Sequence, residues 1–195
     1  MLNQTALKSH QPPAYALEDA VSDHDALEIA AGTLQGLLKG AEGALPPALL
    51  DALHGEGVGH PLHPVLVHLP LGGWVVVAAL DHLPAPEPGA FDRAADAALL
   101  LSTLGAVGTI GTGWLDWANT RGEARRTGLI HGALNEVAFF LNVGSLFARR
   151  RGRRGLGRVL SGVGLGLAVA GGFLGGELVY RHGLGVGRTL AHRQG

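Results

Sequence analysis

The chain has 195 residues, a formal net charge of −1, and 16% charged residues against 47% hydrophobic ones. Soluble domains carry about 25% charged residues, so the deficit points to lipid, and the near-neutral charge gives no reason to expect nucleic acid as a partner. The absence of cysteine excludes disulfides, cysteine-ligated iron–sulfur clusters and covalently attached c-type haem. Metal ligands would therefore come from the ten histidines and the carboxylates.

The N-terminal segment is polar. Residues 1–15 lack an apolar core after a basic start, which predicts a disordered tail and no cleavable signal peptide. In residues 16–60, apolar side chains recur at helical spacing with acids on the other face, and the pair Pro46-Pro47 interrupts them. This pattern predicts short amphipathic helices that lie on the membrane surface or on the rest of the protein. A partly disordered acidic tail is the alternative for the same stretch.

Four apolar runs follow, at about residues 64–83, 94–115, 128–148 and 156–181. A helix of about 20 residues crosses roughly 30 Å of hydrocarbon. A soluble bundle would need polar outer faces, which the second and fourth runs lack. The sequence therefore predicts an all-α fold, an integral membrane bundle of four transmembrane helices over residues 61–183 with a tail at 184–195. We expect a multi-pass protein of the plasma membrane or bacterial inner membrane.

Small residues mark the expected packing faces of these helices. The fourth run is rich in glycine, which weakens a helix in water but lets helices approach closely in lipid. We therefore expect tight helix contacts there, and an oligomer formed through the glycine-rich faces. Pro70 lies inside the first run and predicts a kink that frees the carbonyl of Leu66.

Four spans define two ends of the bundle. Face A holds both chain termini and the loop 116–127, and face B holds the loops 81–93 and 149–158. The arginine-rich run at 149–154 favours the cytoplasm for face B by the positive-inside rule. Face A also carries arginines, so the sequence leaves the orientation open.

Polar side chains within and beside the spans gather at face A. At 1.5 Å per residue, His68 and His131 lie at matching depths of about 6–8 Å along their helices. Asn135 follows His131 by one turn and shares its helix face. Ionisable groups in a span are costly and usually face the bundle interior, and neutral imidazoles ligate metal and haem well. Hydrogen-bonded packing residues are the alternative for each of these histidines.

The candidate cofactor ligands and mouth residues are His68, His131, His63, His182, Arg181 and Asn135. For a metal ion alone the candidates are His68, His131 and Glu177. The identity of the group stays open between b-type haem and a histidine-bound metal.

Four motifs follow one another along the chain: HGEGVGHPLHPVLVHLPLGGWVVVAALD, GWLDW, RTGLIHGALNEVAFFLNVGSLFARR and GGELVYRHGLGV. Over about residues 20–190 they resemble a bacterial "domain of unknown function" family of predicted four-helix membrane proteins. Some members are joined to a Rieske-type ferredoxin domain, which implies nearby electron transfer and a Rieske-type or other redox partner protein. The resemblance implies importance for His60, His63, Asp81, Asp116, His131, Asn135, Tyr180, Arg181 and His182.

Two functions remain open from the sequence. The first is a non-catalytic membrane scaffold or accessory subunit of a membrane complex. The second is a membrane redox subunit in which His68 and His131 are axial ligands of haem, or ligands of a metal, and Arg181 pairs with a propionate. The chain has no nucleophile elbow, P-loop or helical H-E-x-x-H zinc motif, so we do not expect an enzyme by itself.

Overall fold

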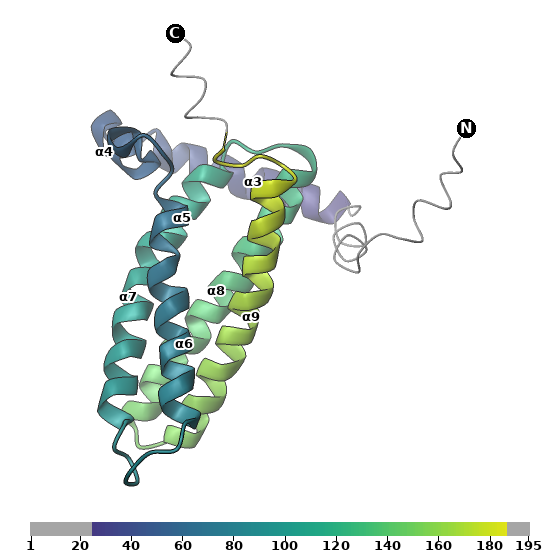
Figure 1. Cartoon of the computed structure of the whole chain (residues 1–195). Helices are drawn as coiled ribbons and strands as arrows, with labels where there is room; N and C mark the ends of the chain where they lie inside the picture. The colour runs from purple at the N-terminus through teal and green to yellow at the C-terminus, as the bar shows by residue number, and fades with distance from the viewer. Residues whose placement is uncertain (1–24, 187–195) are drawn as a thin grey trace, which may run out of the picture.

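The computed structural model describes residues 25–186, which form helices and connecting turns without a strand in that range (Figure 1). The predicted tail at 1–15 lies outside the described residues. The helices are α3 Asp25–Glu42, α4 Pro47–His54, the 3₁₀ helix η1 Glu56–Val58, α5 His63–Leu66, α6 His68–His82, α7 Asp92–Trp117, α8 Gly122–Arg150 and α9 Arg154–Tyr180.

Four helical units are long and apolar enough to cross a membrane: α5 with α6 (His63–His82), α7, α8 and α9. The side chains are distributed as lipid requires. Large apolar groups face outward, with Leu101 63% and Phe140 66% exposed, whereas the interior holds small or polar groups such as Ala138 and Ser145. Small interior residues let transmembrane helices pack closely. The prediction of an all-α bundle of four membrane-spanning helices is confirmed.

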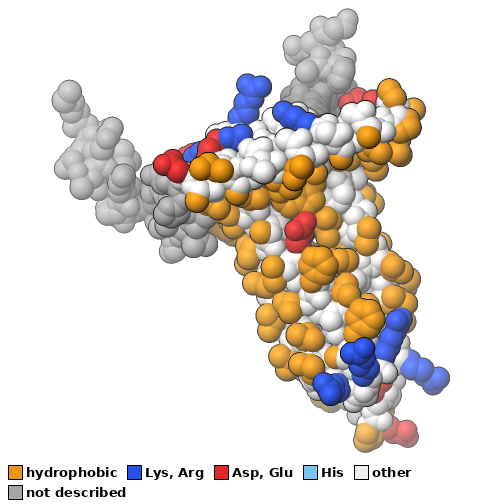
Figure 2. All heavy atoms as spheres, turned by 180° about the vertical axis from the view of Figure 1, so that it is seen from behind, with side chains coloured by type: hydrophobic (Ala, Val, Ile, Leu, Met, Phe, Trp, Pro, Cys, Tyr) orange, Lys and Arg blue, Asp and Glu red, His pale blue; other side chains and the backbone are white. Residues whose placement is uncertain are grey.

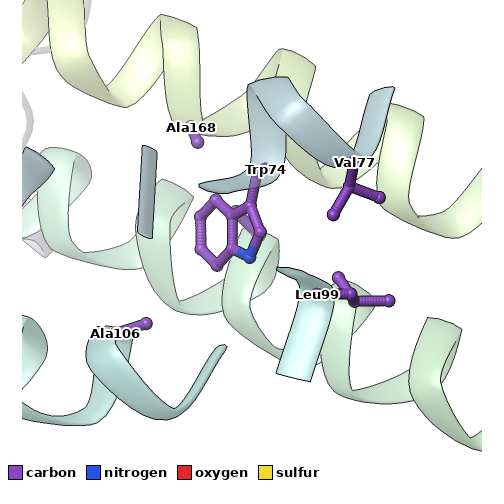
Figure 3. Close-up of a cluster of buried hydrophobic side chains, with 6 residues drawn as sticks. Trp74, Val77, Leu99, Ala106 and Ala168 are labelled. Atoms are coloured by element: carbon purple, nitrogen blue, oxygen red, sulfur yellow. The ribbon is translucent and has the colours of Figure 1, made fainter. Parts of the chain in front are cut away.

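The four spans form a closed ring in which α6 contacts α7, α7 contacts α8, α8 contacts α9, and α9 returns to α6 (Figure 1). At its centre, Trp74 of α6 packs among apolar side chains of the neighbouring helices (Figure 3). Val77 and Leu99 are completely buried beside it, and Ala106 and Ala168 complete the contact. The ring therefore has one continuous apolar core.

The first span is interrupted near face A. α5 ends at Leu66 and α6 begins at His68, just before Pro70. Because proline has no backbone N–H, it cannot bond to the carbonyl of Leu66 four residues earlier. The break therefore occurs where the proline was expected to kink the helix.

α3 and α4 lie across the face A end of the bundle (Figure 1). Gln35 of α3 donates from Nε2 to the carbonyl oxygens of Trp117 at 3.1 Å and Thr120 at 3.0 Å. Glu28 pairs with Arg125 and lies 3.4 Å from Arg126 of α8. These contacts fix α3 to the end of α7 and the start of α8.

Face B is closed by a buried ion pair. The Arg149 guanidinium binds both carboxylate oxygens of Asp81, at 2.9 Å for the Nη1–Oδ1 contact, and both side chains are almost fully buried. Its Nε donates to Ser145 Oγ and its Nη2 to Ser161 Oγ, each at 3.1 Å. Gly157 leaves room for the side chain, because a Cβ there would lie 2.6 Å from Arg149 Cγ. The network joins α6, α8 and α9.

Two further arginines extend this network to the start of α7. Arg154 contacts Asp92 at 2.9 Å and Asp96 at 2.7 Å. Arg158 lies 3.4 Å from Asp81 and 3.6 Å from Asp92. Two of the five arginines in the run 149–154, Arg149 and Arg154, are therefore paired inside the fold.

Candidate functional site

His63 and His131 meet inside the bundle near face A. His63 opens α5 and His131 lies in the third turn of α8. Their ring centroids are 6.2 Å apart and the ring planes are inclined by 81°. Two imidazoles from different spans are therefore neighbours in an edge-to-face arrangement.

A backbone carbonyl fixes each of these rings. His63 Nδ1 lies 2.9 Å from the carbonyl oxygen of Thr109 on α7, and His131 Nδ1 lies 2.7 Å from that of Gly171 on α9. Because a carbonyl only accepts, each Nδ1 carries the hydrogen, and each Nε2 keeps its lone pair in the neutral ring. Nε2 is on the far side of the ring from Nδ1, so the lone pairs point away from α7 and α9. Histidines that ligate metals are oriented by the same kind of bond.

Two glycines allow the rings to lie this close to the helices. A Cβ at Gly113 would lie 2.8 Å from His63 Nδ1, and a Cβ at Gly175 would lie 3.0 Å from His131 Cε1. A separation below 3.0 Å is essentially never seen for a real Cβ, so a larger residue at Gly113 would displace the His63 ring, and one at Gly175 would require the His131 ring to shift by a few tenths of an ångström. Both imidazoles are consequently held against backbone and have little rotational freedom.

His63 and His131 line a cavity of about 140 Å³. It lies between the four spans and residues Leu184 and Gly185, which follow α9. Its walls are mainly apolar and include Trp74, whose Nε1 is buried and has no hydrogen-bond partner among the described residues. Asn135 also lines the cavity, and its Nδ2 donates to the carbonyl oxygen of His131 at 2.8 Å. A cavity needs only about 10–15 Å³ to hold one water, so this one has room for an ion and several waters.

Glu136 is a lining residue that the sequence analysis did not single out. Trp114 donates from Nε1 to Glu136 Oε1 at 2.7 Å, and both side chains line the cavity. The carboxylate lies about 12 Å inside the predicted third span, where a charge is costly without a purpose or a partner. One signal was available in the sequence, because Glu136 is the one acidic residue between Glu123 and Glu177.

His68 is not brought to this cavity. It is exposed on the outer side of α6, where its Nδ1 lies 3.1 Å from the carbonyl oxygen of Val65. His63 and His68 are five residues apart, which is about 140° around a helix, so one of them must face outward when the other faces inward. The place beside His131 that was expected for His68 is taken by His63.

Arg181 and His182 follow α9 at face A and do not line the cavity either. Arg181 Nη2 lies 3.9 Å from Glu123 Oε2 at the start of α8. Of the six candidate cofactor residues, the structure therefore brings together three, His63, His131 and Asn135.

The expected metal triad is not assembled. Within residues 25–186 no group of three or more His, Asp or Glu side chains is placed to hold one ion. Glu177 is two residues after Gly175, which packs against His131, and this offset turns it about 200° around α9. His68, His131 and Glu177 are therefore not brought together, and His131 lies instead beside His63.

The other positions implied by the resemblance are divided between the two ends. Asp116 lines the cavity and lies 3.5 Å from His54 of α4, whereas Asp81 belongs to the face B network. His60 and Tyr180 are exposed.

The family comparison covers the parts of the chain just described. A family described as "Predicted membrane protein (DUF2231)" matches residues 59–188, which include the four spans, the cavity and the face B network but not α3 or α4. No curated protein and no solved structure matches the chain significantly.

Proposed function

This chain belongs to the DUF2231 family of predicted membrane proteins, and on that premise we propose that it is a redox subunit of the bacterial inner membrane that holds one transition-metal centre between His63 and His131. The observation that carries the proposal is the pair of neighbouring imidazoles, arranged edge to face, each with Nδ1 fixed by a carbonyl oxygen at 2.9 or 2.7 Å. Their Nε2 lone pairs have no protein donor to accept from within residues 25–186.

The spacing of the rings supports one shared metal. A histidine nitrogen binds a metal at about 2.0–2.1 Å, and the ring centre lies roughly 1.1 Å further, so two imidazoles on opposite sides of one ion have centroids about 6 Å apart. The observed separation is 6.2 Å.

The donor set and the cavity volume favour a copper ion. Protein zinc sites use three or four protein ligands, whereas copper(I) is stable with two nitrogen donors and imidazole suits it. Haem iron would also need only two protein ligands. The cavity of about 140 Å³ is below the roughly 300–1,000 Å³ of cofactor-sized pockets, so a haem would require the spans to separate.

The remaining lining residues suit a single positive charge. A bound copper ion would supply one-electron chemistry. Glu136 provides a compensating negative charge from the cavity wall, while Asn135 holds the His131 turn and the apolar walls exclude bulk water. Electrons would be exchanged with a Rieske-type or other redox partner protein.

The test is a metal assay and an oxidised-minus-reduced absorption spectrum of the full-length protein purified in detergent, after growth with added copper and haem precursor. We expect about one copper per chain, lost in His63→Ala and His131→Ala and retained in the control His68→Ala. If the protein instead shows a haem spectrum that is lost in the same two variants, the bound centre is haem iron and not a copper ion. A colourless protein free of stoichiometric metal would overturn the proposal.

A second candidate, a membrane scaffold that self-associates, is favoured by the outer side of α9. Gly162 and Gly166 are exposed and have no atom within 4 Å of the position of a Cβ. A Gly-x-x-x-Gly pair facing lipid allows close approach of another helix. Under this function Gly166→Leu abolishes energy transfer between labelled chains in vesicles, while His63→Ala leaves it unchanged.

A further inference from the structure

The exposed arginines at face B differ from the ion-paired ones. Arg149, Arg154 and Arg158 are paired with Asp81, Asp92 and Asp96. Arg150, Arg151 and Arg153 are exposed, and they form no ion pair with any residue of the described range 25–186. With Arg93, which is also exposed and in no ion pair, face B therefore presents four positive charges that no residue of 25–186 neutralises.

One of these arginines closes the end of an apolar groove. The groove runs between α7 and α8 on the outside of the bundle and has a volume of about 200 Å³. Leu104 and Val107 of α7 form one wall, Val143 and Phe147 of α8 form the other, and Arg150 lies at its face B end. Figure 2 shows this combination on the rear of the molecule, with Lys and Arg side chains gathered at the end of a hydrophobic surface.

The length of the groove matches one leaflet of a bilayer. Its lining extends along α8 from Phe139 to Arg150, which is about 16 Å at 1.5 Å per residue. Half of the hydrocarbon thickness is about 15 Å. Arg150 therefore lies at headgroup level when the apolar lining lies among acyl chains.

We propose that this groove is a binding site for an anionic phospholipid, with one acyl chain between α7 and α8 and the phosphate on Arg150. Arg151 and Arg153 in the adjacent turn add positive charge, which complements a headgroup of net negative charge. Basic side chains at the ends of transmembrane helices select anionic headgroups in this way. The site is about one bilayer thickness from the histidine pair and does not depend on the metal.

The test measures lipid binding to the full-length protein in neutral detergent by native mass spectrometry, with phosphatidylglycerol as the probe and phosphatidylcholine as the neutral control. We expect phosphatidylglycerol to bind more tightly, and Arg150→Gln to weaken it about fivefold, the contribution of one arginine near an anionic surface. Arg121→Gln, the same charge change at an exposed position of face A, should leave the affinity unchanged. If both variants lose the same affinity for phosphatidylglycerol, the binding depends on overall charge and not on Arg150, and the proposal is overturned.

A second pair of variants tests the groove itself. Val143→Trp fills the groove without altering charge, so it should abolish tight binding even with all arginines present. Val137→Trp places the same side chain at an exposed position of α8 outside the groove and serves as the control. Helicity and monodispersity of each variant establish that it is folded. If Val143→Trp binds phosphatidylglycerol as the natural chain does, no acyl-chain site exists in the groove.

Discussion

The two ends of the bundle hold polar groups inside the membrane in opposite ways. At face B, Arg149 is surrounded by Asp81, Ser145 and Ser161, and its donors are bonded within a closely packed contact. Near face A, His63 and His131 bond through one ring nitrogen each and leave the other nitrogen beside a cavity. A saturated network stabilises a structure, whereas unused acceptors beside a void provide a place for a ligand. The difference indicates a structural role for the Arg149 network, whereas the proposed metal binding belongs to the cavity near face A.

The strongest test of this contrast is Arg149→Met. Removing the guanidinium leaves Asp81 buried without its main partner, which costs about 3–5 kcal/mol of the free energy of unfolding. Denaturation by SDS in mixed micelles measures the loss. Arg150→Met changes the adjacent, exposed arginine and should alter stability by less than about 0.5 kcal/mol. Similar losses in both variants would contradict a structural role for the buried pair.

A methyl group added at each end gives the next largest difference. In Gly157→Ala the Cβ would lie 2.6 Å from Arg149 Cγ and 3.2 Å from the carbonyl oxygen of Ser145, and such overpacking costs about 1–3 kcal/mol. In Gly172→Ala the Cβ enters open space beside the cavity. That variant should be neutral, or stabilised by up to about 1 kcal/mol through higher helix propensity. Thermal unfolding in detergent measures the change in melting temperature of each variant. Equal changes would contradict the conclusion that face B is more closely packed than the cavity region.

The attachment of α3 is expected to contribute less. Gln35→Ala removes the hydrogen bonds to the carbonyl oxygens of Trp117 and Thr120, which costs about 1–2 kcal/mol. Because these bonds hold α3 and not the spans, amide hydrogen exchange should increase in residues 25–42 and remain slow in α7 and α8. Lys39→Ala on the exposed side of α3 is the matched control. Faster exchange throughout the bundle would contradict this local role.

The smallest effect on stability is expected for His131→Leu. The variant loses one hydrogen bond to Gly171 and gains an apolar side chain at a cavity wall, so the cost should be about 0.5–1.5 kcal/mol. The same variant should lose all bound metal under the proposed function. A cost near that of Arg149→Met would show that face A is as structural as face B.

Hydropathy predicted the spans because each apolar run is long enough to cross the hydrocarbon. It could not predict that α8 begins at Gly122, six residues before the apolar run, because that turn is held by Arg125, Arg126 and Glu28. Such pairing occurs between residues far apart in sequence and leaves no local pattern.

The histidines show the difference between predicting depth from the helical rise per residue and predicting the helix side from the rotation per residue. The rise per residue placed His68 level with His131, whereas the structure brings His63, at the start of α5, to His131 in the third turn of α8. The rise did not select the side of the helix, and the roughly 140° between His63 and His68 would have allowed only one of them to face inward. Asp81 and Arg149 were both visible in the sequence, yet their pairing across 68 residues required the fold.

The buried pair also imposes an order on membrane insertion. Asp81 lies near the end of the first span and Arg149 near the end of the third. More than sixty further residues must therefore be synthesised after Asp81 before its partner is present. A charge at the hydrocarbon boundary without a partner is costly. The hairpin of the first two spans is therefore expected to pack stably only after the third span has been made. A chain that ended before Arg149 would leave Asp81 without this partner.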